Sequence, residues 1–206
     1  SIDPTRARVI LVESGPRVLS AFEPAMSEKA RRQLEALGVE VRTGAPVVSI
    51  AADHVLVGAE RIATHTVLWA AGVAASPLGQ LLGAPLDRAG RVLVEPDLSV
   101  PGQPRIFVAG DLACFKDGER QIPGVAPAAK QMGRQVAAAI RARLRGRPVP
   151  TFRYQDFGAL ATIGRMAAVI QMGRLRLSGL PAWWFWLAAH VFFLIGFRNR
   201  LVVLID

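Results

Sequence analysis

The sequence predicts an α/β fold with parallel strands, and three stretches of the chain carry that prediction. Residues 8–13 are a short apolar run that ends in an acid, which is typical of a buried parallel strand. Residues 24–37 follow with the spacing of an amphipathic helix, and residues 39–42 form the next strand after the stop signal Gly38. A strand, a helix and a strand in this order indicate a parallel, right-handed crossover. A further apolar run, residues 105–111, is broken by Gly-Asp and predicts another buried strand.

The rest of the chain adds shorter elements. Glycine and proline crowd residues 76–102, which predicts a loop region at a crossing between domains. Gly146 and Pro148 are stop signals for a preceding helix. In chain order, we expect an antiparallel meander in 46–61, strands over 66–70 and 91–94, a turn at Ala71-Gly72, a helix over 127–144, and a β-hairpin in which 160–163 and 166–171 flank Gly164-Arg165.

Composition and net charge limit the classes of function that the chain can have. The chain is 51% hydrophobic and 20% charged, which excludes a disordered protein, and its net charge is +9. A basic protein of this kind binds nucleic acid, anionic lipid or an anionic cofactor. Because arginine is concentrated after residue 130, beside the most apolar part of the chain, its placement favours a membrane surface over nucleic acid.

Cys114 is the single cysteine of the chain, so the sequence excludes an intramolecular disulfide and any mechanism based on an internal redox-active cysteine pair. We expect Cys114 to be a small buried residue rather than a nucleophile. The three histidines, at 54, 65 and 190, are too scattered to predict a metal site.

The Gly-Asp pair at 110–111 is the strongest signal of a binding site. Gly110 removes the side chain that would block a close approach to the backbone, and Asp111 offers a carboxylate to hydroxyl groups at the carboxyl end of the strand. A helix opens at Ala126 and Pro127, and the positive end of its dipole could face the same ligand. A Gly-Asp pair alone is often an ordinary turn, but the two signals in this order predict a cofactor site.

Glu13 matches the acid that follows a glycine-rich dinucleotide loop by roughly twenty residues and holds a ribose hydroxyl. The chain contains no G-x-G-x-x-G sequence, and counting back from Glu13 places such a loop before Ser1. We therefore expect the chain to begin partway through a nucleotide-binding domain. An ordinary glutamate at the end of a strand is the alternative.

Together these residues resemble the carboxyl-terminal half of a type II NADH:quinone oxidoreductase. This is a single-subunit, non-pumping flavoprotein of respiratory membranes within the group of FAD-dependent pyridine nucleotide oxidoreductases. The Gly-Asp pair is shared with the wider group, whereas the helix start joined to the aromatic tail is more specific. The resemblance covers nearly the whole chain, and its markers are residues 9–13, 69–73, 106–111, 126–133, 156–158 and 196–200.

The resemblance implies a partial two-dinucleotide-binding-domain, Rossmann-like flavoprotein with a C-terminal β-hairpin and an apolar membrane-associating segment. Residues 1–75 would be part of an NADH-binding domain, residues 76–150 the C-terminal part of an FAD-binding domain, and residues 151–206 the hairpin and the membrane-associating region. The implied reaction passes electrons from NADH through FAD to a quinone. The implied location is peripheral, on the cytoplasmic face of the cell inner membrane.

On the flavin side, the resemblance assigns Asp111 to the ribityl chain of FAD and the backbone around Ala126 and Pro127 to the pyrimidine edge. Gln131, as the catalytic residue, would lie where flavin meets quinone and would orient a quinone carbonyl. Lys130 would add to the stabilisation of reduced flavin by the helix dipole, although a solvated lysine is the plainer interpretation. The family often has glutamine where this chain has Pro127, and that departure puts one quinone-side hydrogen bond in doubt.

On the NADH side, the resemblance assigns Glu13 to the adenosine ribose and places Gly72 near the nicotinamide nucleotide. An acid at position 13 also argues against NADPH, because a 2′-phosphate beside a carboxylate is electrostatically unfavourable.

Residues 180–195 form an apolar, aromatic run near the lower length limit of a membrane span. Tryptophan favours the headgroup level of a bilayer, and arginine faces lipid phosphates. We expect interfacial attachment to an anionic membrane, with a true span and a buried core or homodimer interface as the alternatives. The residues expected to contact lipid are Trp183, Trp184, Trp186, Arg198 and Arg200.

Two other functions stay open at this point. A sulfide:quinone oxidoreductase has a similar architecture but relies on cysteines close to the flavin, and the lone Cys114 argues against it. A catalytically inactive, membrane-binding remnant would equally lack the loops for both cofactor pyrophosphates. A bound flavin absorbance would support the enzyme, whereas a colourless protein that still binds liposomes would support the remnant.

The 206-residue chain by itself is expected to show little NADH oxidation, because it lacks both glycine-rich loops of the family. The measurement is the decay of NADH absorbance in the presence of FAD and a soluble quinone. Robust turnover would contradict this expectation.

Overall fold

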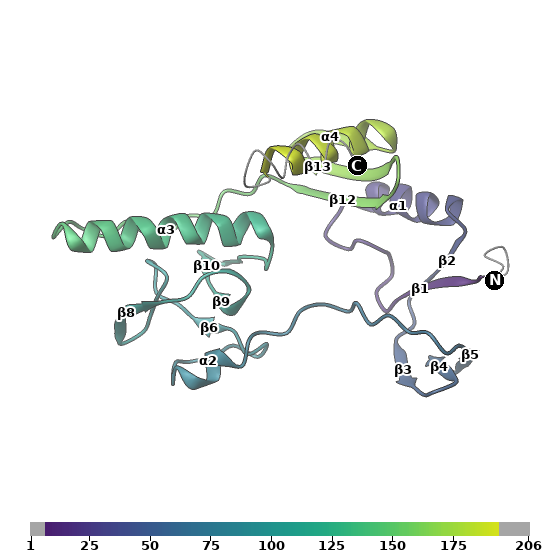
Figure 1. Ribbon diagram of the computed structural model, residues 1–206, viewed down its shortest axis with the longest axis horizontal. Helices are drawn as coiled ribbons and strands as arrows, with labels where there is room; N and C mark the ends of the chain where they lie inside the picture. The colour runs from purple at the N-terminus through teal and green to yellow at the C-terminus, as the bar shows by residue number, and fades with distance from the viewer. Residues whose placement is uncertain (1–6, 194–206) are drawn as a thin grey trace. The chain divides into compact units, whose positions relative to one another are not determined.

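The computed structural model describes residues 7–193 (Figure 1). The chain forms two units: the first contains the residues up to Leu68 and again those from Gly158 onward, and the second runs from Trp69 to Phe157. Both units combine helices with strands, in agreement with the predicted α/β class. The predicted functional regions 1–75, 76–150 and 151–206 stay a prediction.

In the first unit, β1 (Val9–Glu13) and β2 (Val39–Thr43) run parallel, with Val9 opposite Val39. α1 (Pro24–Ala36) connects them, and Pro24 suits its first turn because proline has no N–H group to leave unpaired. Gly38 follows at φ +84°, a left-handed conformation that glycine adopts without strain. The predicted strand–helix–strand unit is therefore confirmed.

A small antiparallel sheet follows in the same unit. It consists of β3 (Val47–Ile50), β4 (His54–Val57) and β5 (Glu60–Ala63), and it confirms the meander predicted in 46–61. Burial of aliphatic side chains from this sheet against β1 stabilises the arrangement. The cluster contains Val55, Val57 and Ile62, with Ile10, Val12, Ala45 and Val47 partly buried around them.

A second antiparallel sheet comes from the C-terminal part of the chain. β12 (Ala159–Gly164) and β13 (Ala167–Met172) form the predicted hairpin, and β14 (Leu175–Ser178) adds a third strand that the sequence analysis missed. The missed signal is Gly173, at φ +52°, followed by the alternating Leu-Arg-Leu of β14. A glycine turn between two alternating stretches is typical of a hairpin.

The aromatic run forms a helix, α4 (Leu180–Phe193), which packs on β13. Ala182 is fully buried there with Ala168 and Ile170. In residues 7–193, no helix has both the length and the apolar character that crossing a membrane requires. The predicted lipid contacts Arg198 and Arg200 lie outside the described residues.

α1 and the C-terminal sheet share one hydrophobic core although they are far apart in sequence. Met26 and Ala30 of α1 are buried together with Val169 of β13. The Glu23 backbone N–H donates a hydrogen bond to Gln171 Oε1 at 2.8 Å, and the Glu23 carboxylate pairs with Arg176. The core of the first unit is therefore built from two segments, α1 and the sheet of β12, β13 and β14, that are far apart in the sequence.

The second unit places short strands on one side of the long helix α3 (Ala126–Leu144), as Figure 1 shows. The helix starts one residue before the predicted position and ends at the predicted one. β6 pairs in parallel with β9, while β7 with β8 and β10 with β11 form antiparallel pairs. The short elements are α2 (Leu78–Leu81), β6 (Val92–Leu93), β7 (Ser99–Val100), β8 (Gln103–Phe107), β9 (Ala113–Cys114), β10 (Lys116–Asp117) and β11 (Arg120–Gln121).

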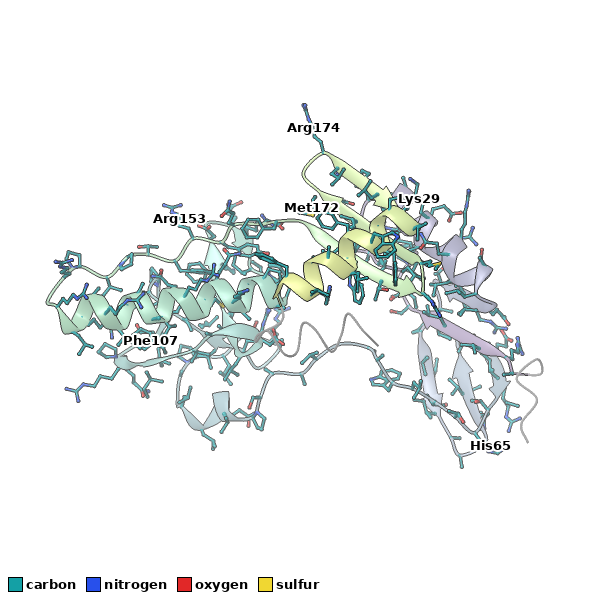
Figure 2. All side chains as sticks on the ribbon, turned by 45° about the horizontal axis from the view of Figure 1, so that its top comes forward. Lys29, His65, Phe107, Arg153, Met172 and Arg174 are labelled. Carbon is teal, nitrogen blue, oxygen red and sulfur yellow. The ribbon has the colours of Figure 1, made fainter. Side chains whose placement is uncertain are left out.

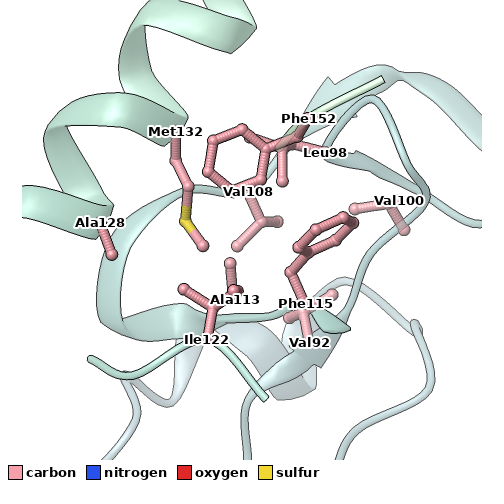
Figure 3. Packing of buried hydrophobic residues seen from close by; sticks show 10 residues of the cluster. All are labelled: Val92, Leu98, Val100, Val108, Ala113, Phe115, Ile122, Ala128, Met132 and Phe152. Atoms are coloured by element: carbon pink, nitrogen blue, oxygen red, sulfur yellow. The ribbon is translucent and has the colours of Figure 1, made fainter. Parts of the chain in front are cut away.

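The core of the second unit lies between α3 and these strands. Figure 3 shows Met132 of α3 pointing toward Val108, with Phe152 and Phe115 beside them. The rings of Phe115 and Phe152 meet edge to face, with centroids 5.3 Å apart. The other buried members are Val92, Leu98, Val100, Ala113, Ile122 and Ala128.

The strand predicted over 66–70 is wrong, because the structure shows no strand in these residues. Leu68 is 89% exposed and Trp69 66% exposed, so the apolar character of the stretch does not bury it in the described part of the chain. Thr64 explains part of the difference, since its hydroxyl accepts the Thr66 N–H at 3.2 Å and donates to the Thr66 carbonyl at 3.0 Å. Such local bonds compete with strand pairing.

The strand that precedes Gly-Asp is also less buried than predicted. β8 ends at Phe107, and Arg105 within it is exposed. Among the described residues its neighbour is the two-residue strand β7, which leaves much of it open to solvent. The strand predicted over 91–94 is likewise reduced to β6 (Val92–Leu93).

Asp97 links α3 to the turn before β7, and we predict that it makes the second unit sensitive to acid. Its carboxylate accepts hydrogen bonds from the Ser99 hydroxyl at 2.6 Å and the Ser99 N–H at 3.0 Å, and it pairs with Arg143 of α3. Burial raises the pKa of Asp97, but the hydrogen bonds from Ser99 and Arg143 outweigh it and hold that pKa below its ordinary value. This stabilisation is present above the unfolded-state pKa and is lost as pH falls through the folded-state pKa.

Asp97→Asn should therefore lower the free energy of unfolding at pH 7 by about 1–3 kcal/mol, the usual contribution of a hydrogen-bonded charge. The loss should shrink as pH falls below about 4, toward the lowered folded-state pKa at which the wild-type carboxylate becomes protonated as well. Urea denaturation at pH 7 and at a pH below about 4 measures this loss of unfolding free energy. Glu119→Gln, an exposed acid in the same unit, is the matched control. An effect of Asp97→Asn that is the same at both pH values would contradict the assignment.

Candidate functional site

Gly110 forms the turn at which the Gly-Asp motif leaves the core. Its φ of +73° lies in the left-handed region, where any residue with a Cβ is strained. The Gly110 N–H points at the sulfur of Met132 on α3, 3.3 Å away. A Cβ at this position would stand 3.5 Å from the Cβ of Ala129, also on α3. The motif is thus fixed against the first turns of the helix by backbone geometry.

Asp111 lies on the one-turn 3-10 helix η2 (Gly110–Leu112) with its carboxylate exposed. Among the residues that the structure describes, none donates a hydrogen bond to this carboxylate. Gly124 lies beside it, because a Cβ at position 124 would stand only 3.3 Å from Asp111 Oδ1. Gly124 was not among the site residues predicted from the sequence, although its position just before the helix start at Ala126 was an available signal.

The N-terminus of α3 supplies backbone donors to the same region. The N-cap residue Val125 is extended, at φ −133° and ψ 151°, and has no side-chain group that could cap the helix. Ala126 and Pro127 follow in the first turn and are exposed. The N–H groups of a first helical turn have no partner within the helix, so they suit an anionic or polar ligand group. Lys130 is exposed on the next turn.

Gln131 is engaged by the chain itself. Its Nε2 donates to the Gln155 carbonyl and its Oε1 accepts the Gln155 N–H, both at 2.9 Å. One turn further along α3, Gln135 donates to the carbonyl of Pro150. The two glutamines thus hold segment 150–156 along the helix, and Gln131 keeps one N–H for a ligand. Its predicted role toward a quinone stays a prediction.

Segment 150–156 is tied to the unit at further points. Phe152 is buried, and its N–H donates to the Pro96 carbonyl at 2.7 Å. The Tyr154 N–H reaches Asp117 Oδ2 at 3.3 Å, and Arg120 pairs with Asp156. The hydrogen bond to the Asp156 carboxylate raises the pKa of Arg120.

A shallow hollow of about 370 Å³ lies between α3 and this segment. Figure 2 shows Arg153 on the segment that runs beside the helix. Five of its six lining residues have polar or cationic side chains, which can hold a polar or anionic group. Its lining residues are Gln131, Arg134, Gln135, Thr151, Phe152 and Arg153.

Glu13 lies in the first unit, at the carboxyl end of β1. Its Oε1 accepts the Gly15 N–H at 2.8 Å, which fixes the carboxylate above the β1–α1 loop. In the described part of the chain, the second carboxylate oxygen accepts no hydrogen bond. One oxygen is therefore held in place while the other stays available to a ligand hydroxyl, as the predicted ribose contact requires.

Gly72 lies in the second unit, in an exposed segment without regular structure. Its φ of +105° requires glycine, and a Cβ there would meet no atom within 4 Å. The need for glycine is therefore conformational. Its predicted place near the nicotinamide nucleotide stays a prediction.

Cys114 is buried, as predicted for a small core residue. Burial raises the pKa of its thiol, and the thiol donates a weak hydrogen bond to Gln121 Oε1 at 3.6 Å. Because the thiolate is the reactive form, these surroundings make Cys114 a poor nucleophile.

The chain belongs to the pyridine nucleotide-disulphide oxidoreductase family, whose model matches residues 5–133. Within this family it is similar to type II NADH:quinone oxidoreductases, and the resemblance stated from the sequence is confirmed. The enzyme NdhA of Mycobacterium tuberculosis is 41% identical over 218 residues, which cover 99% of this chain and 46% of NdhA. A type II NADH:quinone oxidoreductase of Staphylococcus saprophyticus is 31% identical over 169 residues, which cover 79% of this chain and 42% of the relative. The chain thus spans about half the length of these curated relatives.

Solved structures agree on the fold. NDH2 from Plasmodium falciparum, solved in complex with NADH, matches with a TM-score of 0.83 at 17% identity, over 97% of this chain and 57% of that one. An FAD-dependent pyridine nucleotide-disulphide oxidoreductase from Desulfovibrio vulgaris matches with a TM-score of 0.62 at 22% identity. The match covers 78% of this chain and 41% of that one.

Gln131→Leu is expected to loosen segment 150–156, because it removes both hydrogen bonds to Gln155. Two neutral hydrogen bonds contribute roughly 1–3 kcal/mol, so amide hydrogen exchange in this segment should accelerate about tenfold or more. Mass spectrometry of a peptide that contains residues 150–156 measures the rate of exchange. Gln80→Leu, at an exposed position of α2, is the matched control. Unchanged exchange in Gln131→Leu would show that the glutamine does not hold the segment.

Proposed function

We propose that this chain is the C-terminal portion of an FAD-dependent oxidoreductase that passes electrons from NADH to a membrane quinone. The observation that carries the proposal is the 41% identity to NdhA across almost the whole chain. The site adds independent chemical support, because its residues suit the parts of a flavin nucleotide. When bound, FAD supplies the two-electron chemistry that joins NADH oxidation to quinone reduction.

The Gly-Asp turn and the start of α3 fit a flavin nucleotide. Asp111 presents an exposed carboxylate that can accept hydrogen bonds from ribityl hydroxyls. Gly124 keeps the space beside this carboxylate clear, since a Cβ at 124 would crowd Oδ1, and Gly110 supplies the left-handed turn before it. The backbone around Ala126 and Pro127 would then approach the pyrimidine edge of the ring.

The N-terminus of α3 would stabilise negative charge on that edge by about 0.3–2 kcal/mol. Lys130, on the next turn, adds positive charge to the same end of the helix. Gln131 would use its remaining N–H to hold a quinone carbonyl, while Gln155 fixes its rotamer.

Glu13 would hold the adenosine ribose of NADH through its free oxygen, and Gly72 would lie by the nicotinamide nucleotide. A carboxylate at position 13 favours NADH over NADPH, because it would repel a 2′-phosphate.

Membrane attachment on the cytoplasmic face of the cell inner membrane is part of the proposal, since quinones dissolve in the bilayer. α4 supports it by exposing Trp184 at 58% and Phe192 at 69%, both apolar groups that suit a lipid interface. Trp183 and Trp186 are half-buried; Trp183 packs in the core against β13 and Trp186 stacks on His190. Trp184 is therefore the strongest of the three tryptophans as a lipid contact. A homodimer interface on this surface is the alternative occupant.

The test is FAD binding and NADH:quinone turnover by the full-length gene product. The protein should bind FAD and oxidise NADH with a soluble quinone, and Asp111→Ala should weaken FAD binding roughly 10- to 100-fold, the usual effect of losing a charge-assisted hydrogen bond. Titration of protein fluorescence measures the affinity. Glu119→Ala, an exposed acid of the same unit, should bind FAD like the wild type. A protein that binds FAD but reduces no quinone would overturn the proposed function.

A further inference from the structure

The outward face of α3 is strongly basic. Residues 126–147 contain no acidic side chain, and their basic residues are Lys130, Arg134, Arg141, Arg143, Arg145 and Arg147. Arg143 points inward, where it pairs with Asp97 and stacks over the Phe107 ring at 4.8 Å. The fold thus uses one of these arginines for its own stability.

Three of the others form a line, which we call the α3 stripe: Arg134, Arg141 and Arg145. They are spaced by seven and four residues, or about two turns and one turn, so they lie on one side of the helix. That side is opposite the buried face of Ala128, Met132 and Ala139. All three side chains are exposed, and within residues 7–193 none of them makes an ion pair or a side-chain hydrogen bond.

Large aliphatic side chains flank the stripe. Leu144 is 83% exposed and lies next to the stripe, and Ile140 is 43% exposed and lies on the same side, between the stripe and the buried face. At the other end, Arg134 borders the hollow of about 370 Å³ that Arg153 also lines. A row of cations next to exposed aliphatic groups is the pattern of a helix that lies at a lipid interface.

Helix stability alone does not explain this surface. Cations near a helix C-terminus interact favourably with the dipole, which accounts for Arg141 and Arg145 but not for Arg134 at mid-helix. Arg141 and Arg145 are also like charges four residues apart, an arrangement that destabilises a helix. An exposed Leu144 gains nothing from the dipole. An anionic partner with an apolar layer beneath it satisfies all of these groups.

We propose that the α3 stripe binds the headgroups of anionic phospholipids, with Ile140 and Leu144 entering the acyl boundary. This surface belongs to the second unit, whereas α4 belongs to the first. The choice of a bilayer over another polyanion rests on the proposed function, whose acceptor is dissolved in lipid. The aliphatic edge supports the same choice, because nucleic acid phosphates offer no apolar layer to Leu144.

The experiment compares binding of the FAD-loaded full-length protein to phosphatidylglycerol-containing vesicles and to pure phosphatidylcholine vesicles by co-sedimentation. The ratio of the two partition coefficients isolates the charge-dependent part, since apolar insertion by α4 contributes to both. The test variant is Arg134→Gln/Arg141→Gln/Arg145→Gln. Each basic residue at an anionic surface contributes about fivefold, so the ratio should fall on the order of 100-fold.

The matched control is Arg88→Gln/Arg105→Gln/Lys116→Gln, which removes the same charge from exposed positions of the same unit. Its ratio should stay within a few-fold of the wild type. Thermal unfolding by circular dichroism shows whether both variants are folded, and turnover with a soluble quinone reports the proposed function separately. A stripe variant that keeps turnover but shows a lower ratio of partition coefficients supports the inference. If the wild-type protein has no quinone activity, a lower ratio in the stripe variant still supports it.

Equal ratios in the stripe variant and the wild type would overturn the inference, and so would an equal loss in the control. Tighter wild-type binding to a short DNA duplex than to the vesicles, abolished in the stripe variant, would assign the surface to nucleic acid and also overturn it.

Discussion

The left-handed turn at Gly110 is the constraint on which the candidate site depends. It lets the chain leave β8 and turn immediately into η2, so that Asp111 emerges beside the start of α3. Met132 and Ala129 fix that turn from the helix side, and Gly124 keeps the space around the carboxylate clear. A carboxylate and a set of free helix donors are brought together because two backbone segments can approach closely.

α3 then organises the second unit by giving each of its faces a different task. Its buried face, with Met132 and Ala139, packs on the strands. The flank with Gln131 and Gln135 holds segment 150–156, and Arg143 reaches Asp97 near the C-terminal end. The remaining face carries the α3 stripe. Since one helix carries all four groups of contacts, a change in its packing would affect the proposed flavin contacts and the proposed surface contacts together.

The first unit shows a different use of the chain. β1, α1 and β2 form a parallel unit that positions Glu13 at a strand end, while the later strands β12, β13 and β14 return to pack on α1. Met26 and Ala30 meet Val169 in a shared core, and Glu23 is bonded to both Gln171 and Arg176. The segment proposed to face the membrane is thereby built into the same unit as the proposed NADH contact Glu13.

The sequence by itself determined the elements whose signals are local. Apolar periodicity, Pro24, Gly38 and Gly146 located β1, α1, β2 and α3, and the Gly-Asp pair located the turn at 110–111. The strand predicted over 66–70 does not form, because a strand needs a neighbouring strand as well as apolar residues. Neither β14 nor the place of Gly124 in the site was predicted from the sequence. Only the tertiary structure decided that Gln131 is held by Gln155, that Arg143 turns inward to Asp97, and that the C-terminal sheet packs on α1. These outcomes depend on residues far apart in the chain, and periodicity within one segment contains no information about its distant partner.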